Sequence, residues 1–253
     1  MQGQMQDQSY LGSGKLLIRE FGARAPFEEV GNCSAVTLSP QTNTIALADG
    51  TAPGGGERNR VDRLTGVEFA YTFHDFAPEN FARALRGTSS KVAAGKAVDE
   101  PITAYKGGFT PLGKIATAVT AVKPDTGSAV LEAGKDYIFQ DGGLYIPEDS
   151  TIPTSTDGKP NIKVSYDYGA QTTVQALVNP AKQYEMLFLG LNEAQSGKAV
   201  RIRVHKVSGG VMAQLGLIGD QHGQGEVTGA LLPDTSKGAQ LSKYFVVDQE
   251  VVG

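Results

Sequence analysis

Residues 184–207 constrain the fold more than any other stretch, because they contain two apolar runs joined by a short polar link. The second run alternates apolar and polar side chains, in the order Val200, Arg201, Ile202, Arg203, Val204, His205. Successive side chains of a strand point to opposite faces, so this pattern predicts a strand with one dry and one polar face. The link 192–197 contains Asn, Ser and Gly, which favour turns, and the whole stretch is predicted to be a long β-hairpin.

A second long hairpin is predicted from residues 33–48 and 65–75, joined by a flexible, charged loop over residues 49–62. Its second strand alternates aromatic or apolar side chains with polar ones. A short helix should follow, with Asp75 as its cap, Pro78 in the first turn and Gly87 as its stop. The chain has 32 glycines, and short apolar runs recur between Gly, Pro, Asn and Asp clusters. These features predict a mainly β fold, a β-sandwich or open barrel with long hairpins and one short flanking α-helix.

The domain organisation follows from shifts in composition along the chain. Residues 1–14 begin with a Gln-rich, polar segment and are predicted to be a flexible N-terminal arm. Residues 15–105 and 169–253 should form the main β domain, in which residues 91–104 are expected to be a strand pair. Residues 106–168 are richer in Thr, Pro, Gly and Asp, and they predict a small inserted β subdomain.

Composition argues against several classes of function. The formal net charge is −4, whereas tight nucleic-acid binding needs concentrated Lys and Arg. The lone Cys33 permits no intrachain disulfide, and no apolar run approaches the ~20 residues of a membrane helix. Met1–Tyr10 is unlike a signal peptide, so neither export nor a membrane partner is expected.

No motif in the chain predicts catalysis. The run 12–15 lacks the spacing of a phosphate loop, and the three His residues lack metal-ligand spacing. Asp220, His222 and Glu226 are interpreted as a solvated turn, and Arg201 and Arg203 as a solvated or interface face. We therefore expect no enzyme activity, no catalytic or metal site, and no cofactor.

Several stretches taken in order resemble the major tail tube proteins of long-tailed bacteriophages, of the siphophage type. The likeness is one of layout, and it covers most of the chain. It is carried by residues 32–50 leading into 67–75, the helix 75–87, residues 143–146 followed by 162–168, and residues 187–192 through 215–220 to 227–229.

The resemblance implies a structural virion protein whose subunits form hexameric rings. The rings would stack into a hollow tail tube through which DNA is ejected without tight binding. Partners would be other copies of the chain and the tape measure, terminator and tip or baseplate proteins. The protein would reside in the virion tail after assembly in the host cytoplasm.

In such a tube the N-terminal arm and the long loop would link rings and subunits. The matching residues here are Met1, Gln2, Gln4, Tyr10, Asp49, Gly54, Gly55, Gly56, Glu57, Arg58, Arg60 and Asp62. Arg201, Arg203 and His205 form the polar face of the hairpin, and the two arginines are expected to face a neighbour's acids rather than the lumen. The alternative function is a carbohydrate-binding or adhesive β module of a tail fibre or tip. The absence of Trp weighs against that alternative, because adhesive modules present exposed aromatic platforms.

Overall fold

The structure is a computed structural model that describes residues 8–51, 53–127, 129–155 and 157–250. The chain divides into two compact units. Unit 1 comprises Met1–Ser89 and Val174–Gly253, and unit 2 comprises Ser90–Thr173. Antiparallel sheets build both units, and the described residues contain one short α-helix, α1 (Pro78–Ala84), so the prediction of a mainly β fold is confirmed.

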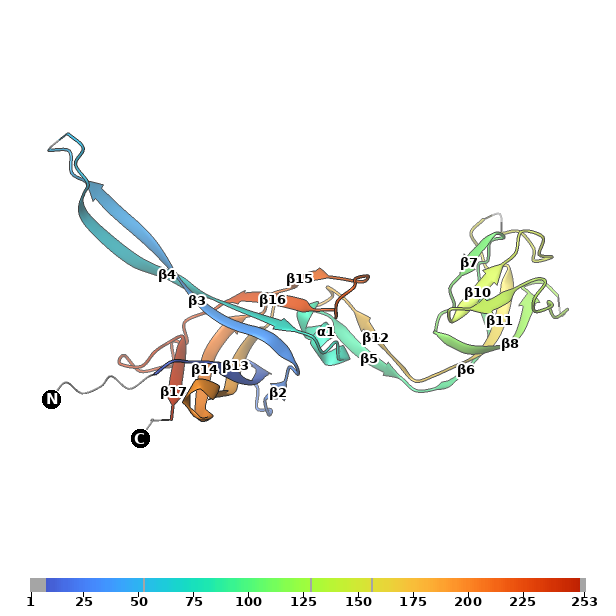
Figure 1. The fold of residues 1–253 in the computed structure, drawn as a ribbon. Coiled ribbons are helices and arrows are strands. Elements are labelled where there is room, and N and C mark those ends of the chain that lie inside the picture. Colours follow the sequence, from blue (N-terminus) through green and yellow to red (C-terminus); the bar gives the residue numbers. More distant parts are fainter. Residues whose placement is uncertain (1–7, 52, 128, 156, 251–253) are drawn as a thin grey trace. The chain divides into compact units, whose positions relative to one another are not determined.

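Unit 1 contains two antiparallel sheets (Figure 1). The first has the strand order β17 (Phe245–Gln249), β14 (Lys198–Ser208), β13 (Gln183–Asn192), β1 (Gly12–Glu20) and β2 (Glu28–Glu29). The second has the order β15 (Met212–Leu215), β16 (Gly225–Ala230), β4 (Glu57–Phe73) and β3 (Cys33–Ala48). The predicted hairpin of residues 184–207 is confirmed as β13–β14, and its link contains the 3-10 turn η1 (Glu193–Gln195).

The two sheets of unit 1 enclose one hydrophobic core, which makes this unit a β-sandwich. Its buried side chains include Leu16, Ile18, Met186, Val204 and Val207 from the first sheet and Phe69, Tyr71, Phe73 and Val227 from the second. The apolar face predicted for β14 does point inward, although Ile202 is only half-buried. Because Arg201 and Arg203 are exposed on the opposite face, the predicted orientation of this strand is confirmed.

Aromatic side chains connect β4 to α1. The rings of Phe69, Tyr71 and Phe73 follow one another along the inner face of β4, with centroids 5.7 and 6.0 Å apart. Phe73 then contacts Phe76, and Phe76 contacts Phe81 of the helix, at 5.6 and 5.1 Å. A helix of 7 residues is too short to persist alone, so this tilted aromatic stack holds it against the sandwich.

The start of α1 differs from the prediction. Ala77 occupies the N-cap position without a side-chain hydrogen bond. The Asp75 carboxylate instead accepts a hydrogen bond from the Asn32 backbone N–H at 2.7 Å and so fixes the start of β3. The helix ends at Ala84, before the predicted stop at Gly87.

Unit 2 contains two three-stranded sheets. One has the order β6 (Gly95–Ile102), β11 (Ile162–Tyr168), β8 (Ala116–Pro124), and the other β7 (Gly108–Thr110), β10 (Gly143–Ile146), β9 (Ile138–Gln140). A separate core fills it, with Val122, Leu144, Ile146, Ile162, Val164 and Tyr166 fully buried. At the boundary between the units, β5 (Thr88–Val92) pairs with β12 (Gln171–Gln175).

The inserted unit is larger than residues 106–168. It begins at Ser90 because β6 pairs with β11 along its length and therefore belongs to the sheet of unit 2. The predicted pairing within residues 91–104 is wrong for the same reason. The strands β5 and β6 are both present, but they pair with β12 and β11 and not with each other.

Candidate assembly surfaces

The hairpin β3–β4 extends well beyond the sandwich. Strand β16 pairs with β4 only between Glu68 and Phe73, so residues 41–66 form a ribbon of two strands (Figure 1). All side chains of residues 41–48 and 57–65 are exposed. We call residues 41–66 the distal ribbon. Two strands with no further layer are marginally stable in water, so a ribbon of this kind gains stability from a covering surface.

The distal ribbon has two chemically different faces. The register pairs Ile45 with Val61, and Leu47 lies two residues further along the same face. These three side chains are 48%, 46% and 60% exposed and form what we call the apolar ribbon face. The opposite face carries Arg60 and Asp62, whose Nε and Oδ1 are 3.2 Å apart. Thr44 joins them by donating its hydroxyl to Asp62 at 2.6 Å.

The loop predicted over residues 49–62 is shorter in the structure. Strand β4 begins at Glu57, so Glu57, Arg58, Arg60 and Asp62 are strand residues and not loop residues. Both faces of the ribbon are exposed there, and no dry face imposes the alternation that would have identified a strand.

The turn that remains links Asp49 to Gly56, with the Asp49 N–H donating to the Gly56 carbonyl at 2.8 Å. Gly54 adopts the left-handed conformation at φ 76°, and Gly54, Gly55 and Gly56 are exposed. Hydrogen bonds from the hydroxyl and N–H of Thr51 lower the pKa of the Asp49 carboxyl.

Residues 12–14 of the predicted N-terminal arm belong to a strand. Met1, Gln2 and Gln4 lie outside the described residues, while Tyr10 is 51% exposed. Strand β1 already begins at Gly12 and pairs there with Asn192. The Asn192 side chain accepts from the Leu11 N–H and donates to the Ser9 carbonyl, both at 3.0 Å. Residues 9–14 are thus held by backbone and side-chain bonds that no local sequence pattern signals.

The cations on the outer face of β14 have a partner within the chain. Asp248 of β17 accepts from Arg201 at 2.9 Å and from Arg203 at 3.2 Å. All three side chains remain between 39% and 51% exposed, so each pair contributes little to stability. A carboxylate 45 or more positions away, which periodicity does not reveal, thus already contacts both arginines, and their pairing with a neighbour's acids stays a prediction.

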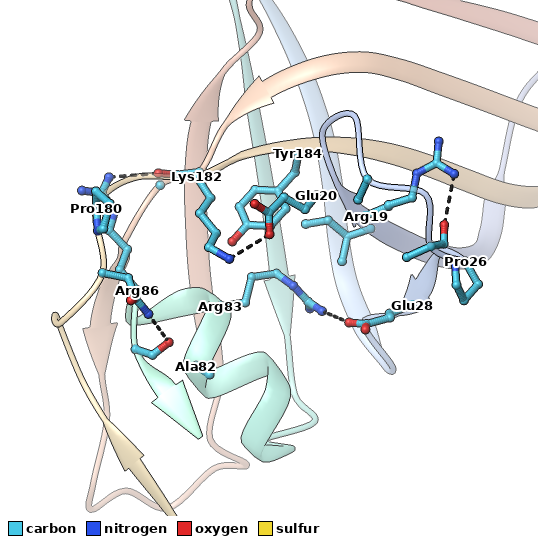
Figure 2. Close-up of a pocket in the computed structure, with 17 residues that line it drawn as sticks. Arg19, Glu20, Pro26, Glu28, Ala82, Arg83, Arg86, Pro180, Lys182 and Tyr184 are labelled. Atoms are coloured by element: carbon cyan, nitrogen blue, oxygen red, sulfur yellow. Dashed lines mark hydrogen bonds and ion pairs between the residues drawn. The ribbon is translucent and has the colours of Figure 1, made fainter. Parts of the chain in front are cut away.

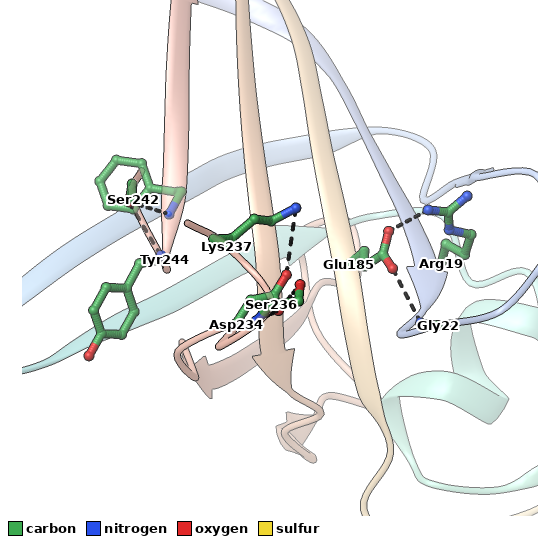
Figure 3. A network of polar contacts seen from close by, with 9 residues as sticks. Arg19, Gly22, Glu185, Asp234, Ser236, Lys237, Ser242 and Tyr244 are labelled. Atoms are coloured by element: carbon green, nitrogen blue, oxygen red, sulfur yellow. Dashed lines mark hydrogen bonds and ion pairs between the residues drawn. The ribbon is translucent and has the colours of Figure 1, made fainter. Parts of the chain in front are cut away.

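His205 lies half-buried on the same outer face. Burial, then the nearby charge of Lys237, lowers its pKa from the ordinary value of 6.5. Figure 3 shows the polar contacts nearby, where Asp234 bonds to Ser236 and Lys237. In the same figure Glu185 bonds to both Arg19 and the Gly22 N–H. Several charges on this side of unit 1 are therefore paired within the chain.

A pocket of about 340 Å³ lies beside the C-terminal end of α1, and we call it the helix-end pocket (Figure 2). Its lining combines six charged side chains with small and apolar residues. Arg83 donates to Glu28 at 2.7 Å, and Lys182 donates to Glu20 at 2.8 Å. Arg86 also reaches into the lining and donates to the Gly209 carbonyl at 2.9 Å. Sequence reasoning missed this pocket because its walls come from four separate stretches of the chain.

Exposed apolar side chains also occur outside the distal ribbon, and two groups of them are neighbours in sequence or in register. Leu217 and Ile218, in the turn between β15 and β16, are 84% and 101% exposed. In unit 2 the register places Phe109, Tyr145 and Ile138 side by side across β7, β10 and β9. Phe109 is 48% and Ile138 41% exposed, and we call these three residues the apolar row.

The described residues do not bring together a metal site or an activated thiol. They contain no group of three or more His, Cys, Asp or Glu side chains arranged to hold a metal ion. Burial raises the pKa of Cys33 to about 11, so its thiol stays protonated and packs against the core of unit 1. No helix in this part of the chain has the length and apolar character needed to cross a membrane.

Comparison with known proteins gives a family without an activity. None of the curated proteins matches the chain. One family model does match, over residues 9–248, and it therefore spans both units and nearly all the described strands. The chain belongs to the family described as protein of unknown function UCP028589.

Proposed function

We propose that this protein is a structural subunit that assembles with copies of itself into hexameric rings, which stack into the hollow tail tube of a bacteriophage. DNA passes through that tube during ejection without being bound tightly. Further partners are the tape measure, terminator and tip or baseplate proteins, and the assembled protein is located in the virion tail.

The observation that carries this proposal is the distal ribbon. It exposes Ile45, Leu47 and Val61 on one face, and its other face carries the ion pair of Arg60 and Asp62. A long, exposed two-stranded ribbon with an apolar face makes a free protein prone to aggregation, and a defined partner surface that covers the ribbon prevents this. Self-association supplies such a surface in every copy at once.

The open sheet edges support the same proposal. Strands β3 and β15 form the edges of the second sheet, and β17 forms one edge of the first. Strand β3 is 16 residues long, so its unpaired edge is extensive. Joining edges between neighbours around a ring satisfies these backbone groups without leaving an end.

The experiment is to purify the protein and raise its concentration in stages. Size-exclusion chromatography with light scattering should show hexamers or larger species, and negative-stain microscopy should show rings or tubes. A monomer at every concentration and salt condition would refute the proposal. A variant lacking residues 45–61, with a short Ser-Gly link in their place, should stay folded and assemble poorly.

A second candidate function rests on the apolar row of unit 2. Aromatic side chains on an exposed sheet face are suited to stacking on sugar rings, and Phe109 and Tyr145 lie adjacent there. This arrangement favours an adhesive role for unit 2. Titration with a panel of bacterial surface glycans would test it, with binding expected for the parent and lost in Phe109→Ala.

A further inference from the structure

The helix-end pocket of unit 1 contains more hydrogen-bond donors than the protein itself uses. Its lining includes four cationic side chains but only two carboxylates, Glu20 and Glu28. Arg83 and Lys182 bond to these two carboxylates, and Arg19 bonds to Glu185 next to the pocket. The carboxylates of the lining are therefore engaged, and Arg86 contributes a positive charge that they do not balance.

The guanidinium of Arg86 is poorly satisfied. It has five N–H donors, and its Nη2 donates to the Gly209 carbonyl at 2.9 Å. Its Nε is buried and has no hydrogen-bond partner among the described residues. A buried donor without an acceptor costs free energy, so the protein itself leaves the hydrogen-bonding capacity of this guanidinium incompletely used.

The backbone of Arg86 is also held in an unfavourable conformation. Its φ is +47°, the left-handed region that favours glycine, although Gly87 is the next residue. The Arg86 carbonyl accepts from the Asn179 N–H at 2.9 Å, which helps to hold the turn. Strain at a charged residue beside a pocket indicates a role for its side chain, because glycine at this position would relieve the strain.

Tyr184 adds a neutral hydroxyl donor to the lining. Figure 2 shows Tyr184 beside Lys182 and Glu20 inside the pocket. Burial raises the pKa of Tyr184, so its hydroxyl stays protonated and can donate. The volume of about 340 Å³ falls at the small end of the range of roughly 300–1,000 Å³ for ligand pockets.

We propose that the helix-end pocket binds an anionic oxygen group, a carboxylate or a phosphate, with Arg86 as its main donor. A guanidinium presents paired N–H groups that match two oxygens of such a group. The group can belong to a free anion or to an acidic side chain of a second copy of the chain. Only the second source rests on the proposed assembly.

Inorganic phosphate is the probe. Isothermal titration of the parent should show saturable binding at constant ionic strength, and replacing chloride by phosphate should raise its melting temperature. Arg86→Gln should weaken phosphate binding roughly 10- to 100-fold, as expected for loss of a charge-assisted hydrogen-bonded pair. Arg201→Gln is the matched control, because Arg201 pairs with Asp248 on the outer face, and its binding should equal that of the parent.

Arg86→Gly separates binding from folding. Glycine tolerates the left-handed backbone, so this variant should melt at or above the parent temperature in chloride and yet fail to bind phosphate. The proposal is overturned if the parent shows no saturable binding, or if either Arg86 variant binds like the parent. It is also overturned if Arg86→Gly melts well below the parent in chloride, since Arg86 would then be structural.

Measuring self-association in the chloride and phosphate buffers distinguishes the two sources of the anion. If phosphate raises the concentration needed for self-association, the natural ligand is a carboxylate of a second copy. If assembly is unchanged by phosphate, the ligand is a free anion. Phosphate binding by a chain that never assembles would refute the proposed function alone, and assembly without phosphate binding would refute the pocket alone.

Discussion

Replacing the three side chains of the apolar ribbon face with serine should weaken self-association without unfolding the subunit. Ile45, Leu47 and Val61 are 48%, 60% and 46% exposed, so about half of each side chain remains to be buried by a partner. Complete burial of such a side chain is worth about 1.5–3 kcal/mol, and half of that for three residues is about 2.3–4.5 kcal/mol. The concentration at half-assembly should therefore rise roughly 50- to 2,000-fold.

Leu64→Ser is the matched control for this triple variant. Leu64 is 56% exposed, but its register partner is Thr42, which places it on the opposite face of the distal ribbon. Sedimentation velocity over a concentration series would measure assembly, and circular dichroism would measure the melting temperature of each subunit. The reasoning is refuted if Leu64→Ser weakens assembly as much as the triple variant, or if the triple variant assembles like the parent.

Three further outcomes test the fold and its electrostatics. Val204→Asp should destabilise the subunit by more than about 4 kcal/mol and leave it insoluble or unfolded, because Val204 is 4% exposed in the core. Arg203→Ser should cost at most about 1 kcal/mol, and similar melting curves for the two variants would show that the two faces of β14 are assigned the wrong way round. Asp136→Asn should destabilise unit 2 by about 1–3 kcal/mol, because the Asp136 carboxylate accepts three hydrogen bonds from Glu132 and Thr151. An unchanged denaturant concentration at the midpoint of unfolding would contradict this assignment. His205 has a lowered pKa in the folded state, so the unfolded state gains a proton first, and the free energy of unfolding should fall as the pH drops through 6.5 toward the folded pKa. His205→Gln should remove this part of the pH dependence, and a parent melting temperature that is constant between pH 7.5 and 5.5 would contradict the assignment.

Alternation of side chains was sufficient to predict the strands that border a core. Val200 and Val204 alternate with Arg201 and Arg203, and the buried and exposed faces of β14 follow that order. The aromatic positions of β4 were predicted in the same way. In both strands one face is dry and the other wet, so burial imposes a period of two on the sequence.

The second strand of the distal ribbon does not show this alternation clearly enough to be predicted. Within one subunit both of its faces are exposed, so the core of the subunit imposes no alternation on them, and residues 57–62 have the composition of a charged loop. Strand β3 continues through Pro40 because β3 is an edge strand, where a missing N–H on the open side removes no ladder bond. An alternating sequence pattern therefore predicts a strand only where the core of the same subunit buries one of its faces.

The helix-end pocket could not be predicted for a different reason. Arg86, Lys182 and Glu28 lie on separate stretches of the chain, and none belongs to a motif with a fixed spacing. Even the strain at Arg86 is visible only in the backbone, since the neighbouring glycine at 87 is the residue that a sequence pattern selects as the helix stop. Such a site forms only when tertiary packing brings these stretches together, and no local sequence pattern predicts that packing.

The pairing of β1 with β13 imposes an order on events during synthesis. The Leu11 N–H bonds to the side chain of Asn192, 181 positions later in the chain. All of unit 2, by contrast, is continuous in sequence and is complete before β13 leaves the ribosome. Domains fold as units while translation proceeds, so unit 2 can fold while β1 still lacks its partner strand. The sandwich that carries the distal ribbon can therefore close only after β13 has been synthesised, which is later than the point at which unit 2 can fold.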